Sequence, residues 1–331
     1  MTETVLVTGG TGFIAGWCVA ALQERGYDVR TTVRDPRTAP SHHVAEPSHH
    51  VADLTRDEGW DQAVAGCDYV LHVASLVTTA ATDPDALVAP ARDGTLRVLR
   101  AAVRAGVRRV VFTSSAAASS PRSTEPDGVT DETLWTNTDD PGLTPYRRSK
   151  PLAERAAFDF IAEHGGDTEL STVLPGWVLG PFSGRPPGNL GSLQVVQRLL
   201  SGQLPGVPRV GFEVVDVRDI ADLHIRAMTD PAAAGERFLG TGEFLWMAEM
   251  AEILRDRLGS AASRVPTQPL PDDMVRTAAQ HDPDLGTIVA NLGRRRIRSS
   301  DKARRLLGWA TRPAADAVEA SGRDLVAATE R

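Results

Sequence analysis

Short apolar runs alternate with longer amphipathic stretches through the first half of the chain. Val5–Val7 is an apolar run of strand length, and a helical pattern follows it from about Gly12 to Arg25. Further strands are expected at 28–33, 69–73, 110–113 and 171–174, and further helices at 57–66, 84–105 and 145–164. Strands that alternate with helices predict a mostly parallel sheet with helices on both faces. The fold class is therefore α/β, with a Rossmann-type doubly wound sheet.

The regular alternation ends after Pro175. Residues 181–208 are rich in proline and glycine, which indicates loops and irregular structure. Beyond them the pattern predicts a strand at 212–217 and helices at 220–228, 246–258 and 301–307. We expect a dinucleotide-binding domain over residues 1–175, to which the chain returns around 214–230. Residues 176–331 should form mainly a smaller C-terminal α/β substrate domain.

Composition narrows the class of protein. The chain has 331 residues, 36 Lys plus Arg and 43 Asp plus Glu, which gives a formal charge of −7. A mildly acidic chain is a poor candidate for binding nucleic acid or an anionic membrane. The two cysteines exclude a disulfide scaffold and a cysteine-rich zinc site. With no membrane-spanning apolar run of roughly 18 residues and no signal peptide, we expect a cytoplasmic protein.

One short segment occurs twice. The sequence SHHVA spans Ser41–Ala45 and again Ser48–Ala52, and the two copies hold four of the eight histidines. Adjacent histidines on an extended segment face opposite ways, and no carboxylate or cysteine lies at ligand-like spacing. We interpret the segment as a solvated loop made by a small duplication, and expect no metal site.

A glycine-rich turn follows the first strand directly. It reads TGGTGFIAG over Thr8–Gly16, between a predicted strand and a predicted helix. Gly9 can take the positive φ that a tight turn needs, and Gly12 lets the backbone approach a ligand. The helix start offers free N–H groups to a pyrophosphate. The candidate cofactor contacts in this turn are Gly9, Thr11, Gly12, Phe13 and Ile14.

The end of the second strand bears on the choice of nicotinamide cofactor. An NAD site usually carries an acidic residue there, for the ribose 2′-hydroxyl, but this chain has Val33. Arg34 follows at once, and a guanidinium suits a 2′-phosphate. Asp35 weakens this argument, because it can pair with Arg34 or contact ribose. We expect NADP(H) rather than NAD(H), with Asp53 and Leu54 near the adenine.

Tyr146 and Lys150 form a Y-x-x-x-K motif on a predicted helix. Residues at i and i+4 share a helix face, so the ammonium can stabilise a phenolate and lower its pKa. The tyrosine can then exchange a proton with a carbonyl oxygen while hydride is transferred. Pro151 follows Lys150, removes the hydrogen bond to the Arg147 carbonyl, and should bend the helix.

The fourth strand ends in polar residues that can reach the ligand crevice. Ser114 and Ser115 face opposite ways if the strand continues through them. We choose Ser115 as the residue that hydrogen-bonds the substrate oxygen, with Ser114 structural or facing the cofactor. Thr113 is also assigned to the cofactor site.

These residues together resemble the extended short-chain dehydrogenase/reductase family, part of the NAD-dependent epimerase/dehydratase superfamily. Within that family the chain is most similar to the dihydroflavonol 4-reductase and aldehyde/ketone reductase branch. Besides the glycine turn, the resemblance rests on residues 30–36, 71–75, 111–116, 146–154, 174–182, 217–221 and 300–309.

The resemblance implies roles for particular residues. Ser115, Tyr146 and Lys150 would be the catalytic triad, and Arg34 would hold the 2′-phosphate. The remaining cofactor contacts implied are Val73, Ala74, Ser75, Pro175 and Val178. Flavonoid-reducing members carry an asparagine and a glutamine where this chain has Ser120 and Glu213, so these two pocket residues argue against a plant-type flavonoid substrate. Members work as monomers or as homodimers.

Three functions remain open at this point. The first is an NADPH-dependent carbonyl reductase for a hydrophobic aldehyde or ketone, or the reverse alcohol oxidation, with Tyr146 as proton donor. The second is an NAD-dependent nucleotide-sugar epimerase or dehydratase, against which Val33 and Arg34 argue. The third is a non-catalytic dinucleotide-sensing protein, against which the intact Tyr146 and Lys150 argue.

Overall fold

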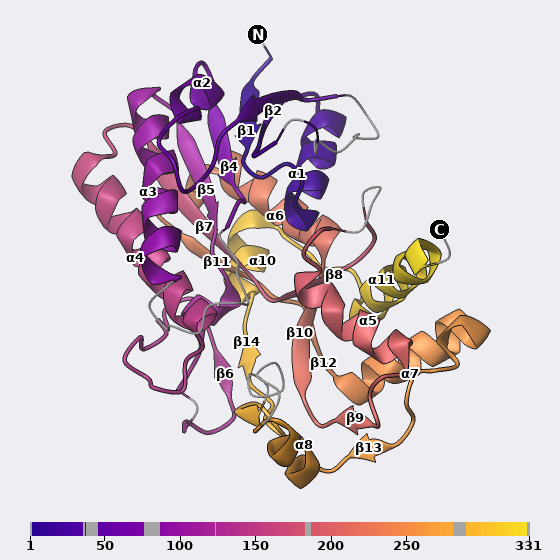
Figure 1. The fold of residues 1–331 in the computed structure, drawn as a ribbon. Helices are drawn as coiled ribbons and strands as arrows, with labels where there is room; N and C mark the ends of the chain where they lie inside the picture. Colours follow the sequence, from indigo (N-terminus) through magenta and orange to yellow (C-terminus); the bar gives the residue numbers. More distant parts are fainter. Residues whose placement is uncertain are drawn as a thin grey trace.

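A seven-stranded parallel sheet forms the larger part of the molecule (Figure 1). The computed structural model describes residues 2–35, 37, 46–75, 87–122, 124–182, 187–280 and 289–329. The strands of the sheet are β1 (Thr4–Val7), β2 (Asp28–Val33), β3 (Ser48–Val51), β4 (Tyr69–His72), β5 (Arg109–Thr113), β7 (Glu169–Pro175) and β11 (Arg237–Gly240). Their order, β11-β7-β5-β4-β1-β2-β3, reverses direction between β1 and β4. Ligands of doubly wound sheets bind at this reversal, beyond the carboxyl ends of the strands. The predicted α/β class is confirmed.

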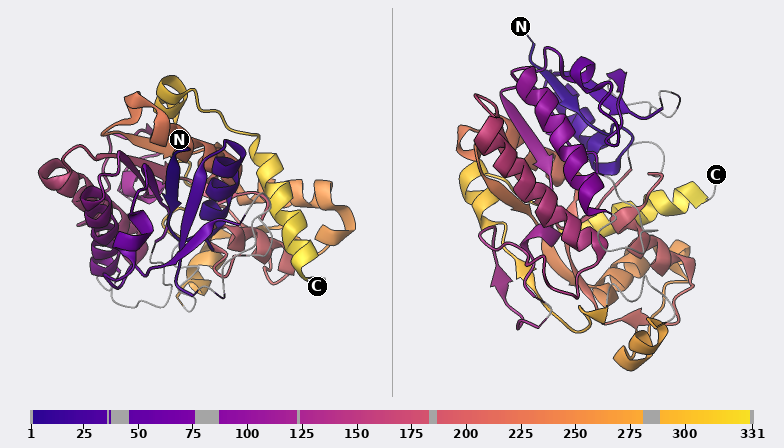
Figure 2. Two further views of the ribbon diagram at one scale, coloured as in Figure 1. Left: turned by 90° about the horizontal axis from the view of Figure 1, so that it is seen from above. Right: turned by 60° about the vertical axis from the view of Figure 1, so that its left-hand side comes forward.

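Helices cover both faces of the sheet because its strands are buried on both sides. Val5 and Val7 pack with α1 (Phe13–Glu24) and α6 (Val217–Thr229) on one face. Figure 2 shows helices on both faces of the sheet. Leu6, which points the other way from Val5 and Val7, packs in the core with the helices of the opposite face. Those helices are α2 (Trp60–Val64), α3 (Val88–Arg104) and α4 (Pro145–His164). Alternate side chains of one strand thus serve two separate cores.

The chain leaves this sheet after Pro175 and enters a second one. Gly176 donates its N–H to the Gly240 carbonyl at 2.9 Å, and a Cβ at Gly176 would lie 2.7 Å from the Glu213 carbonyl oxygen. Only glycine allows the backbones to approach so closely. The second sheet consists of β8 (Trp177–Leu179), β10 (Gly211–Asp216) and β12 (Glu243–Trp246), in the order β12-β10-β8.

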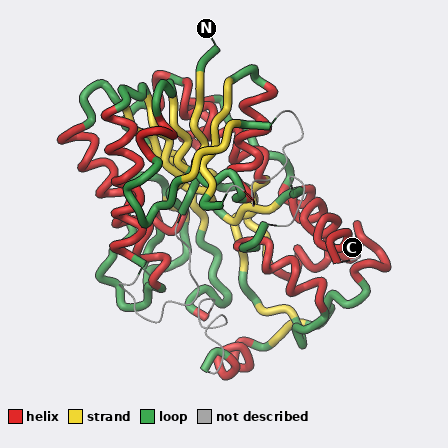
Figure 3. The backbone as a smooth tube through the Cα atoms, turned by 45° about the horizontal axis from the view of Figure 1, so that its top comes forward, coloured by secondary structure: helices red, strands yellow, loops and turns green. Residues whose placement is uncertain are grey.

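The second sheet has a core of its own. The sheet and its helices lie at the lower right of Figure 1 and on the right of Figure 3. Helices α5 (Gln194–Ser201), α7 (Met247–Leu258) and α11 (Ala314–Thr329) contribute its apolar side chains. The smaller elements are η2 (Ala116–Ser119), β6 (Val129–Thr130), η3 (Gly191–Leu193), β9 (Val207–Pro208), η4 (Pro231–Ala233), η5 (Gly259–Ala262), β13 (Pro269–Leu270), α8 (Asp272–Ala278), β14 (Ile297–Arg298) and α10 (Asp301–Leu307). The chain returns to the large sheet with α6, beside α1, and with the edge strand β11. The domain boundary at residue 175 stays a prediction.

Two local expectations differ from the structure. The proline- and glycine-rich segment contains α5, whose Val195, Val196 and Leu199 are buried in the second core. The second SHHVA copy is not a loop, because its first four residues form the edge strand β3. The first copy lies outside the described residues. Helix α4 continues as one helix through Pro151, and the bend expected there stays a prediction. Across the described segments, no helix combines the length and apolarity that a membrane crossing requires.

Candidate cofactor and catalytic site

The glycine turn closes tightly between β1 and β2. Gly9 has φ +71°, and its N–H donates to the Thr32 hydroxyl at 3.0 Å. Gly10 donates to the Thr32 carbonyl at 3.0 Å, and a Cβ at Gly10 would lie 2.8 Å from the Thr31 Cβ. The backbone at residues 9 and 10 therefore has the left-handed turn and the close approach that require glycine.

The turn places the uncapped N-terminus of α1 at the point between β1 and β4 where the strand order reverses. Gly12 is the N-cap, no side chain caps it, and the first turn carries no acidic residue. Thr11 and Gly12 are exposed, and Phe13 and Ile14 are half-buried. An uncapped helix start has free N–H groups and the positive end of the helix dipole, so this cradle fits a pyrophosphate.

The end of β2 carries a cation and no carboxylate. Val33 is buried, and Arg34 after it is exposed. Two hydrogen bonds from Thr55, each 2.8 Å, hold Asp53 and lower the pKa of its carboxyl group, to which the charge of Arg34 adds. Arg34 and Asp53 thus lie in one electrostatic neighbourhood, as expected of two residues assigned to the adenosine end.

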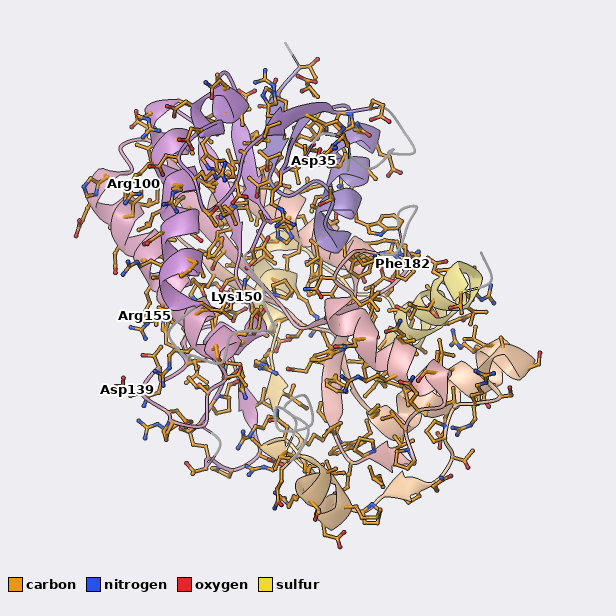
Figure 4. All side chains as sticks on the ribbon, viewed as in Figure 1. Asp35, Arg100, Asp139, Lys150, Arg155 and Phe182 are labelled. Carbon is orange, nitrogen blue, oxygen red and sulfur yellow. The ribbon has the colours of Figure 1, made fainter. Side chains whose placement is uncertain are left out.

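Neighbouring side chains complete this end of the site. Asp35 is bound by Arg37 at 2.7 Å, and these hydrogen bonds lower the pKa of Asp35. Figure 4 shows Asp35 beside α1, far from Lys150. Leu54 is buried beneath α3, where a Cβ at Gly94 would lie 3.0 Å from the Leu54 Cβ. Leu54 therefore packs the wall of the site rather than standing free.

The segment after β4 is tied to the glycine turn by a buried threonine. Thr8 shares a 2.9 Å hydrogen bond with His72 Nδ1, and its hydroxyl also accepts the Ala74 N–H at 2.9 Å. Burial is the main cause that lowers the pKa of His72, and the positive charge of Lys150 is the second; together they lower it to about 3. A neutral His72 thus helps to position Val73–Ser75 against the turn.

Lys150 contacts both the segment after β4 and the tyrosine. Its Nζ donates to the Ser75 hydroxyl at 3.0 Å and lies 5.5 Å from the centre of the Tyr146 ring. Lys150 is buried near the centre of the molecule (Figure 4). The N-cap Thr144 and Pro145 set the start of α4, which places Tyr146 and Lys150 on one face of its first turns.

The two serines after β5 have different environments. Ser114 is buried and donates to Glu154 at 2.7 Å, which supports the structural interpretation. Ser115 is half-buried, and its hydroxyl accepts the Ala117 N–H at 3.1 Å at the start of η2. That acceptor role leaves the Ser115 proton free to donate to a substrate oxygen.

Thr113 faces a buried histidine. His224 Nδ1 lies 2.7 Å from the Ile220 carbonyl, so this nitrogen carries the proton. Nε2 then accepts the hydroxyl proton of Thr113 at 2.7 Å. Burial lowers the pKa of His224 to about 4. The Thr113 side chain is therefore engaged inside the protein, which leaves its backbone for any cofactor contact.

A buried ion pair lies beneath the candidate catalytic residues. Glu154, one turn after Lys150 on α4, is fully buried and accepts from Arg237 Nε at 2.9 Å and from Thr172 at 2.7 Å. Arg237 also donates to the carbonyl oxygens of Ala118, Glu132 and Leu134. The backbone at Ala118, Glu132 and Leu134 is thereby fastened to α4 and to the edge of the large sheet.

Ser120 and Glu213, the two candidate substrate-pocket residues, both accept hydrogen bonds from Arg298. Arg298 donates to both carboxylate oxygens of Glu213, with the bond to Oε2 at 2.6 Å, and to the Ser120 hydroxyl at 2.9 Å. Ser120 and Glu213 are both buried. Pro175 and Val178 flank Gly176, where the chain passes between the two sheets. The structure therefore gathers all four residues at the junction of the sheets.

Sequence reasoning missed several of these residues. Thr8 and His72 lie inside the recognised motifs, but nothing in the sequence indicates that they form a hydrogen bond across 64 positions. Glu154 and Arg237, and likewise Glu213 and Arg298, are 83 and 85 positions apart. The nearest signal was a glutamate one helical turn after the motif lysine. The described residues include no group of three that could hold a metal ion.

Comparisons with known proteins agree on one family. The model of the NAD dependent epimerase/dehydratase family matches residues 5–239. Cinnamoyl-CoA reductase 1 of Oryza sativa subsp. japonica is 38% identical over 264 residues, which are 77% of this chain and 75% of that one. Dihydroflavonol 4-reductase of Zea mays is 35% identical over 272 residues, 77% of this chain and 74% of that one. Gre2 of Candida albicans in complex with NADPH has a TM-score of 0.80 and 27% identity, with 98% of this chain and 99% of that chain covered.

Proposed function

We propose, from its family, what this chain does. It belongs to the NAD dependent epimerase/dehydratase family, in the dihydroflavonol 4-reductase-like branch of the extended short-chain dehydrogenases/reductases. The proposed function is that of an NADPH-dependent carbonyl reductase for a small aldehyde or ketone. One observation carries the proposal most directly. Lys150 contacts Ser75 and faces the Tyr146 ring at the carboxyl end of the sheet. The relatives named as reductases of cinnamoyl-CoA and dihydroflavonol, and Gre2 in complex with NADPH, support the same reaction class.

The residues present fit NADPH. The uncapped start of α1 suits the pyrophosphate, and the exposed Arg34 suits a 2′-phosphate. When bound, NADPH supplies a hydride from C4 of its nicotinamide ring. Lys150 can bind ribose hydroxyls in the position from which it now donates to Ser75.

Proton transfer falls to this chain's own side chains. Ser115 donates a hydrogen bond to the carbonyl oxygen and orients it. Tyr146 gives its phenolic proton to that oxygen as hydride adds to the carbonyl carbon, and the two steps together yield the alcohol. The Lys150 ammonium stabilises the phenolate left on Tyr146. The same groups in reverse would oxidise an alcohol.

Oxidation of NADPH and of NADH against a panel of aryl and alkyl aldehydes and ketones tests the proposal. We expect turnover with an NADPH preference, and a loss of kcat of about 10²-fold or more in Tyr146→Phe, with cofactor binding retained. Turnover by Tyr146→Phe at the wild-type rate would contradict the role of the tyrosine. Tightly bound NAD in the purified protein, with no carbonyl turnover, would favour a nucleotide-sugar epimerase or dehydratase instead.

A further inference from the structure

A short strap of three residues lies between helices α1 and α11. It consists of Gly180, Pro181 and Phe182, directly after β8. Figure 4 shows Phe182 between α1 and the C-terminal helix. All three residues bond to or pack against one or both helices. The strap thus joins the start of α1, beside the large sheet, to a helix of the second core.

Helix α11 holds the strap from one side through two polar side chains. Ser321 is fully buried, and its hydroxyl accepts the Gly180 N–H at 2.8 Å and donates to the Gly180 carbonyl at 3.1 Å. Asp324, three positions later on the same helix face, accepts the Phe182 N–H at 2.5 Å. A serine inside a helix commonly bonds a carbonyl of its own helix, whereas this hydroxyl is committed to the strap.

Helix α1 holds the strap from the other side, on a face that begins at the glycine turn. The Trp17 indole N–H donates to the Pro181 carbonyl at 2.8 Å. The ring of Phe13, one helical turn earlier, meets the Phe182 ring edge to face, with 6.3 Å between the ring centres. Phe13 also packs against the cores of both sheets. The strap therefore connects α1 to α11 through three hydrogen-bonded backbone groups or pairs and one aromatic contact.

The α1 end of this connection is the cofactor cradle. Phe13 is the first residue of α1 after the N-cap Gly12, so its ring belongs to the turn whose free N–H groups suit the pyrophosphate. Helix ends fray, and no side chain caps this one. The contacts of Phe13 and Trp17 with the strap restrain the turn before a cofactor binds. A cradle held in this way loses less conformational freedom on binding.

We infer that Ser321 and Asp324 are positioning residues for the cofactor: they hold the strap against α1, and the strap keeps the pyrophosphate-binding turn in place. The inference rests on the cofactor part of the proposed function, and it adds the C-terminal helix to the elements on which cofactor affinity depends. The effect acts through the pyrophosphate, which NADPH and NADH share. It should therefore be equal for the two dinucleotides, unlike the effect expected of Arg34.

Calorimetric titration of Asp324→Ala with NADPH and with NADH tests the inference. The variant leaves the Phe182 N–H without its acceptor, and we expect both Kd values to rise about 5-fold or more, the lower end of typical coupling between sites. Loss of a negative charge by itself would strengthen the binding of an anionic cofactor, so a rise in Kd is not a charge effect. Asp324→Asn keeps an acceptor oxygen and should bind both dinucleotides nearly as the wild type does.

One further ligand and two further variants sharpen the measurement. 2′-AMP has the 2′-phosphate but no pyrophosphate, so its Kd should not change in Asp324→Ala. Trp17→Phe removes the indole N–H that the Pro181 carbonyl accepts, and should raise the Kd of both dinucleotides. Asp316→Ala is the matched control, because it removes a carboxylate from α11 that pairs with Arg257 at 2.7 Å and not with the strap. Its Kd values should equal those of the wild type.

The outcomes separate the inference from the function on which it rests. Unchanged dinucleotide affinity in Asp324→Ala, or an equal rise in the Kd of 2′-AMP, overturns the role of α11 and leaves the reductase intact. A changed ratio of the NADPH and NADH Kd values places the effect at the 2′-phosphate and also overturns it. Ser321→Ala, which removes both bonds to Gly180, takes the place of Asp324→Ala if that variant does not fold. A wild type that binds neither dinucleotide refutes the cofactor part of the proposed function.

Discussion

Replacing Glu154 with glutamine tests how helix α4, which carries Tyr146 and Lys150, is fastened to the sheet. Glu154 is fully buried. It accepts hydrogen bonds from Ser114, Thr172 and Arg237 at 2.7, 2.7 and 2.9 Å. The Arg237 side chain is only 8% exposed. Glutamine keeps the shape of the side chain but removes its charge, so the variant leaves a buried guanidinium without its counter-charge.

The expected loss of stability follows from that burial. Breaking a buried ion pair by removing one partner costs about 3–5 kcal/mol, because the remaining charge stays desolvated. The unfolding entropy of about 2.1 cal/mol/K per residue makes each kcal/mol correspond to about 1.4 °C in Tm for 331 residues, so we expect a decrease of roughly 4–7 °C. Asp61→Asn is the control. Its partner is Arg104, both side chains are more than half exposed, and such a pair contributes about 1 kcal/mol or less.

Activity should fall as well, but less than in Tyr146→Phe. Arg237 holds the carbonyl oxygens of Ala118, Glu132 and Leu134, and Glu154 fixes Ser114, the neighbour of Ser115. Loosening these contacts would displace groups that orient the substrate without removing the proton donor. Carbonyl turnover measured well below the new Tm separates this effect from unfolding.

Thermal unfolding of the wild type, Glu154→Gln, Arg237→Met and the double variant Glu154→Gln/Arg237→Met completes the experiment. We expect the double variant to be less destabilised than the sum of the two single replacements, because neither charge is then left alone. A Tm within 2 °C of wild type for Glu154→Gln, or strict additivity, would refute this account of the ion pair.

Two further predictions concern the cofactor and pH. Arg34→Ala should raise the KM for NADPH about 10-fold or more and change that for NADH little, since only NADPH has the phosphate that the guanidinium suits; equal changes would show that Arg34 does not contact it. Stability should fall as the pH drops from about 6.5 to about 4, because burial lowers the pKa of His72 to about 3 and of His224 to about 4. The unfolded chain binds protons as the pH falls through that interval, while the folded His72 and His224 stay largely neutral, which amounts to about 3 kcal/mol for each. Chemical denaturation against pH should show this slope reduced in His224→Gln, and an identical slope would contradict the assignment.

The sequence by itself determined the large sheet and the local part of the site. Alternating apolar runs and amphipathic stretches are set by neighbours two to four positions apart, so β1, α1, β2 and α4 were predictable to within a few residues. The glycine turn and the Tyr146–Lys150 pair have the same local character, because their geometry follows from one turn and from one helix repeat. These short-range rules need no knowledge of the rest of the chain.

Only the tertiary structure decided which distant residues complete the site. The second sheet brings Arg298 onto Glu213 and Ser120, and the return of the chain at β11 brings Arg237 onto Glu154. Tertiary packing also made a helix of residues 194–201 within a segment rich in proline and glycine. Contacts across more than 80 positions depend on how the two sheets pack against each other. The ion pairs at that junction follow no helix or strand periodicity, so the sequence pattern does not predict them.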